Sequence, residues 1–179
     1  MALRKASSYS KKKARPYTRK SAKRRKAFIK AVPQNKIVKY NMGNNKDNTQ
    51  GKHKYEVMLI SNEKVQIRDN ALEACRQLIN KSMDKTAPGN YYFVVKVFPH
   101  HILRENKVAA GAGADRLSSG MKHSFGITIG RAAMINPGKE IFYISCLDEK
   151  TARLARSALI KAKSKIPCGS KIMFRKIAD

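Results

Sequence analysis

A glycine-rich basic segment near the middle of the chain carries the residue types best suited to contact a ligand. Residues 113–121 read Gly-Ala-Asp-Arg-Leu-Ser-Ser-Gly-Met, and Phe125-Gly126 and Gly130 follow. Glycine permits positive φ and close backbone approach to a phosphate, while arginine, lysine and histidine donate hydrogen bonds to it. A loop of about twenty residues inside a compact domain is usually functional or disordered. Its apolar Leu117, Met121 and Phe125 favour a loop that acquires its shape against a partner.

The histidines, glycines and carboxylates that could support catalysis or bind a metal do not form a recognisable site. His53, His100, His101 and His123 lack ligand spacing, and the adjacent His100 and His101 should point to opposite faces of an extended segment. Gly111 and Gly113 begin a dinucleotide-like pattern, but the third glycine position holds Arg116. Asp115 stands alone beside Arg116 and is expected to form an ion pair or to brace the loop, not to act as a general base. We therefore expect no catalytic residue, no bound metal and no cofactor.

The three cysteines also argue against a metal site. Cys75, Cys146 and Cys168 are widely spaced and odd in number, and no CxxC pair exists. A zinc knuckle or ribbon needs such pairs. We expect reduced cysteines packed in or near a core, as in an intracellular protein.

The charge of the chain indicates the kind of partner. Lys and Arg number 39 against 12 Asp and Glu, which gives a formal net charge of +27 in 179 residues. Such a field opposes the compact state unless a polyanion neutralises it, and nucleic acid gains further from counterion release. An anionic membrane is the alternative partner, but no run of eighteen apolar residues could span a bilayer. The basic N-terminus also lacks the apolar core of a secretory signal.

The first thirty residues form a basic arm. They hold thirteen Lys or Arg and no acid, with too few apolar residues to bury anything, so we expect an arm that is unstructured alone and follows RNA phosphates. A localisation signal or a solubilising tail is the alternative interpretation. The candidate phosphate-binding residues of the arm are Lys11, Lys12, Lys13, Arg15, Arg19, Lys20, Lys23, Arg24, Arg25 and Lys26.

The rest of the chain, residues 31–179, is predicted to be a single globular α+β domain. We expect short strands around Ile37–Tyr40, Tyr55–Ile60, Tyr91–Phe98, Ile129–Ile135, Glu140–Leu147 and Lys171–Phe174, with a turn at Met42–Asn45 and a surface loop over Asn44–Lys54. Two amphipathic helices are expected among them. Because the strands and helices do not alternate regularly, the pattern favours α+β rather than α/β architecture.

The two helices are predicted from their apolar stripes. One begins near Ile67–Asn70, capped by Asp69 or Asn70, and ends at Pro88-Gly89; the other begins at Asp148-Glu149 and ends at Pro167. Arg76, Lys81, Arg153, Arg156, Lys163 and Lys165 fall outside the stripes. The residues expected to face the core are Ala71, Leu72, Cys75, Leu78, Ile79 and Met83 in the first helix, and Leu154, Ala155, Ala158, Leu159, Ala162 and Ile166 in the second.

Two long motifs carry a family resemblance. Residues 98–107 read Phe-Pro-His-His-Ile-Leu-Arg-Glu-Asn-Lys, and the Gly113–Met121 segment is followed by Phe125-Gly126. Arg15–Arg19, Val32-Pro33 and Asn70–Ala74 add to the match. On these residues the chain resembles the large-subunit ribosomal protein family L-ten-e of archaea and eukaryotes, whose bacterial relative is L-sixteen.

This resemblance implies an α/β-hammerhead fold, with two helices on a mostly antiparallel sheet, and a structural role in the large subunit of the cytoplasmic ribosome. The implied partners are large-subunit rRNA near the central protuberance, 5S rRNA, tRNA, neighbouring ribosomal proteins and assembly factors of late maturation; no membrane and no homo-oligomer are expected. The loop 105–128 would reach toward the peptidyl-transferase centre and tRNA. Its implied contact residues are Arg104, Lys107, Gly111, Gly113, Asp115, Arg116, Gly120, Lys122 and His123.

The chain departs from the family pattern at two places. The family usually has Lys-Pro after the Phe-Gly pair, where this chain has Ile127-Thr128, and the segment 21–30 is longer and more basic than usual. An alternative function is a free RNA-binding or chaperone protein that acts outside the ribosome. An RNA-modifying enzyme would need a cofactor loop or an acid–base pair, which the sequence does not show.

Overall fold

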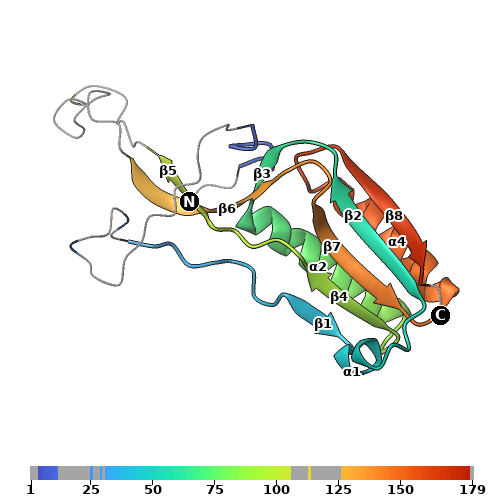
Figure 1. Cartoon of the computed structure of the whole chain (residues 1–179). Helices are drawn as coiled ribbons and strands as arrows, with labels where there is room; N and C mark the ends of the chain where they lie inside the picture. The colour runs from blue at the N-terminus through green and yellow to red at the C-terminus, as the bar shows by residue number, and fades with distance from the viewer. Residues whose placement is uncertain are drawn as a thin grey trace.

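A computed structural model describes residues 4–11, 25, 29, 31–105, 113 and 126–177. Within these residues, two antiparallel sheets and three helices form an α+β fold, so the predicted fold class is confirmed (Figure 1). The first sheet has the order β1 (Asn41–Gly43), β4 (Tyr91–Val95), β7 (Glu140–Cys146), β2 (Tyr55–Ser61) and β8 (Ser170–Lys176). The second has the order β3 (Val65–Arg68), β6 (Ile127–Ile135) and β5 (His101–Glu105).

Two long helices supply much of the core. The helices α2 (Asp69–Thr86) and α4 (Glu149–Lys163) contact each other, and each packs on strands of the five-stranded sheet. Leu72, Ile79 and Leu159 are completely buried there, beside Phe93 and Phe142 of the sheet, whose rings lie 5.8 Å apart. The apolar stripes therefore predicted both helices and their buried faces. Leu78 and Leu154 are exceptions, because both are only half-buried at the edge of the core.

Several predicted boundaries differ from the structure. The first helix begins at Asp69, after the strand β3, which the sequence prediction missed by assigning Ile67 to the helix. Its N-cap position is Arg68 and carries no side-chain cap bond; Asp69 accepts from the amide of Asn70 at 2.8 Å. The predicted loop 44–54 contains the short helix α1 (Asn45–Thr49), which Asn44 caps by accepting from the amide of Asp47.

The start of the five-stranded sheet also lies further along the chain than predicted. Residues 36–39 have no strand, and β1 covers Asn41–Gly43 because pairing with β4 begins at Asn41. Gly43 has a φ of +83°, and a Cβ there would collide with the carbonyl oxygen of Tyr91. Only glycine fits this close approach of two strands. The strand predicted over Tyr91–Phe98 ends at Val95, before the turn at Pro99.

Candidate nucleic-acid interface

The described beginning of the basic arm lies along the outer edge of β3. The guanidinium of Arg68, which is 4% exposed, donates to the carbonyl oxygens of Arg4 and Lys5 at 2.8 and 2.7 Å. The amide of Gln66 donates to the carbonyl of Ser10 at 3.0 Å, and its side chain donates to the carbonyl of Tyr9. Residues 4–11 are thus fastened to the sheet by polar groups of one strand.

A surface ion pair joins the same segment to the strand that leads into the loop. Arg4 Nη2 lies 2.6 Å from Oε1 of Glu105, the last residue of β5, and the Arg4 guanidinium also donates to the hydroxyl of Tyr9. The carboxylate of Glu105 raises the pKa of Arg4 above its usual value. Tyr9 has a φ of +65°, a conformation that non-glycine residues seldom adopt. The contacts of Tyr9 with Arg4 and Gln66 hold this turn in place.

The segment that directly follows the arm contacts strand β6. The hydroxyl of Thr128 donates to the carbonyl of Ala31 at 3.0 Å, and Nε of Arg131 donates to the carbonyl of Pro33 at 2.7 Å. Ile29 is only 3% exposed. The expectation that residues 1–30 contribute nothing to the folded core is therefore wrong at Ile29 and at Ala6, which packs against the core.

The loop itself leaves from the free end of the β5–β6 hairpin. Glu105 pairs with Ile127, and a register shift lies between Leu103 and Arg104. Within the loop the structure describes Gly113, whose φ is +79°; a Cβ there would meet nothing within 4 Å, so the backbone conformation alone favours glycine. Because Arg4, Ala31, Glu105 and Thr128 meet at this hairpin, the described flanks of the arm and of the loop share one end of the molecule (Figure 1).

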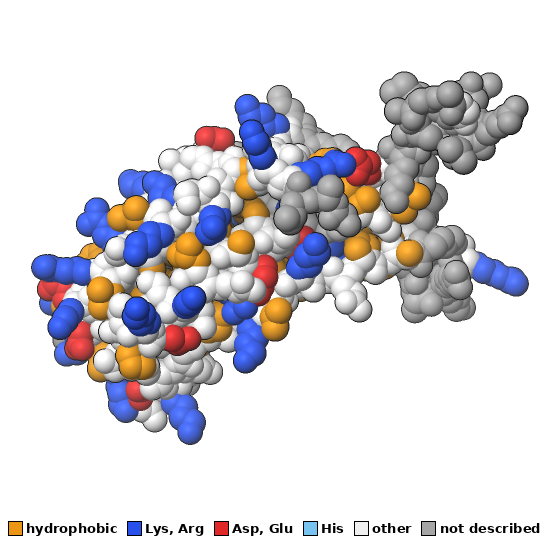
Figure 2. Space-filling view, turned by 180° about the vertical axis from the view of Figure 1, so that it is seen from behind, with side chains coloured by type: hydrophobic (Ala, Val, Ile, Leu, Met, Phe, Trp, Pro, Cys, Tyr) orange, Lys and Arg blue, Asp and Glu red, His pale blue; other side chains and the backbone are white. Residues whose placement is uncertain are grey.

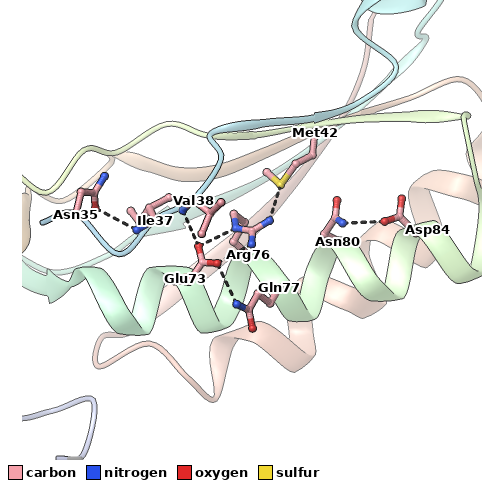
Figure 3. Close-up of polar contacts among 9 residues, drawn as sticks. All are labelled: Asn35, Ile37, Val38, Met42, Glu73, Arg76, Gln77, Asn80 and Asp84. Atoms are coloured by element: carbon pink, nitrogen blue, oxygen red, sulfur yellow. Dashed lines mark hydrogen bonds and ion pairs between the residues drawn. The ribbon is translucent and has the colours of Figure 1, made fainter.

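The segment that follows the arm is bound to α2 by two acids. Asp69 accepts from the amide of Lys36 at 3.3 Å, and Glu73 accepts from the amide of Val38 at 3.3 Å. Arg76 holds Glu73 by two hydrogen bonds of 2.7 and 2.6 Å and also reaches Sδ of Met42 at 3.2 Å (Figure 3). Arg76 lies outside the apolar stripe, as predicted, but its side chain is only 11% exposed. It braces the segment instead of facing solvent.

The pKa values of these two acids move in opposite directions. Burial raises the pKa of Asp69, and the bonds from the backbone amides only partly offset this. Burial would also raise the pKa of Glu73, but the bonds from Arg76, Gln77 and Val38 outweigh it and lower the pKa below the usual value. Glu73 therefore stays charged and is paired with Arg76 beneath the segment. The exposed charged residues of the segment are the basic Lys36 and Lys39.

Exposed basic side chains cover the helical layer. Figure 2, which views the molecule from behind, shows Lys and Arg spread over the body with a few acids among them. The exposed basic residues of α2, of α4 and of the turn after α4 are Lys81, Lys85, Lys150, Arg153, Arg156, Lys161, Lys163 and Lys165. Among them Arg153 pairs with Glu149 at 2.6 Å. This surface can contact phosphates in addition to the arm and the loop.

The structure describes a minority of the candidate contact residues. Lys11 and Arg25 are exposed, Gly113 is exposed, and Arg104 is half-buried in β5. The remaining candidates lie outside the described residues: Lys12, Lys13, Arg15, Arg19, Lys20, Lys23, Arg24 and Lys26 of the arm, and Lys107, Gly111, Asp115, Arg116, Gly120, Lys122 and His123 of the loop. The residues that fasten the arm, Gln66, Arg68 and Arg131, were missed; the one available signal was polar side chains alternating within a strand-like run.

The described cysteines and histidines show no arrangement for catalysis. Burial raises the pKa values of Cys75 and Cys146 to about 12, so neither thiol forms a nucleophilic thiolate near neutral pH. His53 Nδ1 lies 2.7 Å from Oγ of Ser145, but both residues are buried, and burial lowers the pKa of His53. Ser145 donates onward to Asn48 at 2.8 Å, which braces α1.

Metal-binding clusters and membrane-spanning helices are both absent from the described part of the chain. There, no group of three or more acidic, histidine or cysteine side chains is placed to hold a metal ion. No helix in that part has the length and apolar character needed to cross a bilayer. As predicted, His100 is exposed and its neighbour His101 is buried, so the two side chains do not act together.

The fold and the site define a class of protein: a small, strongly basic α+β protein in which the described flanks of two basic segments meet at one hairpin. The family model described as Ribosomal protein L16p/L10e matches residues 14–173. The chain belongs to this family, the L-sixteen and L-ten-e family of the sequence resemblance. It is accordingly a structural component of the ribosome and not an enzyme, as predicted.

Relatives match over almost the full chain. Large ribosomal subunit protein uL16 of Staphylothermus marinus is 42% identical over 176 residues, which cover 98% of this chain and 95% of the relative. The protein of the same name from Methanococcus maripaludis is 43% identical over 180 residues, covering 100% and 98%. That of Archaeoglobus fulgidus is 41% identical over 165 residues, covering 90% and 87%.

Proposed function

We propose that this chain is a structural constituent of the large subunit of the cytoplasmic ribosome that binds large-subunit rRNA and contacts neighbouring ribosomal proteins. The family membership and the names of its relatives support the ribosomal role. The formal charge of +27 supports an RNA partner, because each phosphate contact releases counterions. No second function is favoured by a described feature.

One observation carries the finer proposal: the flanks of the arm and of the loop meet at the β5–β6 hairpin. A basic arm beside the base of the loop can bind the phosphates that surround the loop's target. The hairpin would then act as a fixed stem, since its strands pair over residues 101–105 and 127–132. In this proposal the arm increases the affinity for rRNA, and the hairpin fixes the position of the loop relative to its target.

The proposed location follows the family resemblance. The arm and the helical surface bind rRNA near the central protuberance and 5S rRNA, and the loop 105–128 reaches toward the peptidyl-transferase centre and tRNA. Arg104, Lys107, Arg116, Lys122 and His123 would supply its donors, and its glycines would allow close backbone approach. The chain would join late in subunit maturation, with assembly factors as transient partners.

A difference from the family pattern also has a structural basis. Where the family usually has Lys-Pro, this chain has Ile127-Thr128, and the Thr128 hydroxyl donates to the carbonyl of Ala31 while Ile127 is 58% exposed. A proline at 128 would lack this hydroxyl. We propose that this position contributes to holding the arm beside the hairpin and makes no basic contact with RNA.

Sedimentation of large subunits tests the proposed function. Cells expressing the tagged full-length chain are lysed, and large subunits are washed in high salt before centrifugation. We expect the chain to remain in the large-subunit fraction at about one copy per subunit. A chain that moves to free RNA or to the top of the gradient after the wash would support the alternative, an RNA-binding or chaperone protein outside the ribosome.

A further inference from the structure

Three rings form a partly exposed ladder at the edge of the core. The rings of Tyr40 and Phe98 are stacked, with centroids 5.5 Å apart and planes at 24°. The rings of Phe98 and His100 lie 4.6 Å apart at 48°. Phe98 remains 41% exposed and His100 is exposed, whereas Tyr40 is half-buried beside the core. The ladder thus runs from the core edge to solvent.

The backbone fixes this arrangement. The amide of His100 donates to the carbonyl of Phe98 at 3.0 Å across Pro99, which makes a tight turn and brings two side chains that flank a proline to the same side. The amide of Val95 donates to the carbonyl of Tyr40 at 2.9 Å, and the Tyr40 hydroxyl accepts from Asn35 at 2.6 Å. The ladder is therefore built before any partner arrives.

The surroundings of the ladder are basic. Lys36, Lys39 and Lys96 are exposed on the two segments that carry the rings. Of the nearby acids of α2, Glu73 is paired with Arg76, and Asp69 is buried and accepts from the amide of Lys36. Aromatic faces beside cations are the combination that proteins use to hold unpaired nucleotides.

We propose that the Tyr40–Phe98–His100 ladder is a binding site for one unpaired base of large-subunit rRNA, with Lys39 at an adjoining phosphate. The base extends the ladder at its exposed Phe98–His100 end. This proposal rests on the proposed function and adds to it a contact that depends on stacking, away from the arm and the loop. A protein partner would not need the lysines.

Binding of the full-length chain to large-subunit rRNA, measured over a series of salt concentrations, tests the ladder. Phe98→Leu keeps an apolar side chain but removes the ring, and Phe98→Tyr keeps the ring. We expect Phe98→Leu to bind about tenfold more weakly, the size of one lost base stack, and Phe98→Tyr to bind within about twofold of wild type. The salt dependence should be the same in all three, because no phosphate contact is lost.

A charge variant gives the matched contrast. A Gly-Ser linker of equal length in place of residues 12–24 removes seven Lys or Arg and keeps the anchored residues 4–11. It should reduce the salt dependence while Phe98→Leu does not. In ultraviolet crosslinking, a single nucleotide should crosslink to Phe98 or His100 in the wild type and be lost in Phe98→Leu. If Phe98→Leu proves unstable, His100→Asn replaces it as the test, because His100 is exposed and lies outside the core. It should also weaken binding to rRNA.

Wild-type affinity of Phe98→Leu and His100→Asn, or no crosslink at the ladder, would overturn the proposal. Unchanged rRNA affinity combined with loss from subunits would also overturn it and would assign the ladder to a neighbouring protein. These outcomes are separate from failure of the proposed function, in which the wild-type chain itself would not bind large-subunit rRNA.

Discussion

The five-stranded sheet and the three-stranded sheet hold their neighbouring segments by different means. Around the first, α2 and α4 pack through apolar side chains such as Leu72, Phe142 and Leu159, which are completely buried. Around the second, the two flanks of the arm are held by side chains that donate to backbone carbonyls, as Arg68 and Arg131 do. The core is thus stabilised by buried area, while the parts proposed to bind RNA are fastened by a few polar bonds.

This difference predicts different responses to mutation. Loss of a core side chain should weaken the whole fold, because α2, α4 and the five-stranded sheet share one cluster. Loss of a polar bond at the other end should release a segment and leave the cluster intact. The arm and the loop flanks can then adjust to RNA without a cost to the core.

The largest effect is expected in the core. Leu159→Ala should lower the free energy of unfolding by about 2–5 kcal/mol, since the side chain is completely buried between α4 and the sheet. Leu78→Ala is the matched variant on α2 and should cost only about 1 kcal/mol, because its side chain is half-buried. Urea unfolding measures both. Equal losses at the two positions would show that the helix faces are wrongly assigned.

The second prediction concerns the fastening of the arm. Arg68→Met keeps the length of the side chain and removes its bonds to the carbonyls of Arg4 and Lys5. The free energy needed to release residues 4–11 from the sheet should fall by about 2 kcal/mol, as expected for the loss of hydrogen bonds from a charged donor. Amide hydrogen exchange should rise over residues 4–11 and stay unchanged in α4. A rise throughout α4 would mean that Arg68 supports the core and not the arm alone.

A smaller effect than at Leu159 or Arg68 is expected at Glu73, which joins the segment after the arm to α2 by accepting from the amide of Val38. Glu73→Gln should lower the free energy of unfolding at pH 7 by about 1–2 kcal/mol, because its charge-assisted bonds to Arg76 weaken. The pKa of Glu73 is below its ordinary value of 4.5, so its contribution is complete above that pH and is lost as the pH falls through the folded value.

The measurement is the stability of wild type and Glu73→Gln between pH 7 and pH 3. The difference between them should narrow as the pH falls below 4.5, the ordinary pKa of a glutamate. Asp69, whose pKa is raised, shifts stability in the opposite direction but does so in both proteins and cancels in the difference. A stability difference that stays constant from pH 7 to pH 3 would show that the charge of Glu73 does not contribute to stability.

The helices and strands with a regular spacing of apolar residues could be predicted from the sequence. The stripes of α2 and α4, the strands β2 and β7 and the breaks at Pro88 and Pro99 were all visible, because apolar spacing and proline restrict local structure directly. The strand β3 was missed because Val65–Arg68 has only four residues and runs straight into α2, so that Ile67 was assigned to the helix. Local patterns also could not show that β6 and β7, joined by one turn, belong to different sheets.

The attachment of the candidate interface to the fold was not predicted from the sequence. Charge and glycine content marked the arm and the loop, because composition is a local property. The bonds from Arg68 to residues 4 and 5, and from Thr128 to Ala31, join positions far apart in the chain to backbone carbonyls, which have no sequence signature. The Tyr40–Phe98 stack could not be predicted either, because its two rings lie far apart in the chain.

Replacement of residues 108–122 by a Gly-Ser linker tests the central claim most directly, namely that the loop positions its target while the rest of the chain attaches to rRNA. The variant replaces the native copy in cells, and large subunits are assayed for content of the chain and for the rate of peptide-bond formation. We expect incorporation close to normal with slow late maturation or slow peptide-bond formation, and a milder defect in Arg116→Ala. Subunits that carry the linker and translate at wild-type speed would contradict the account.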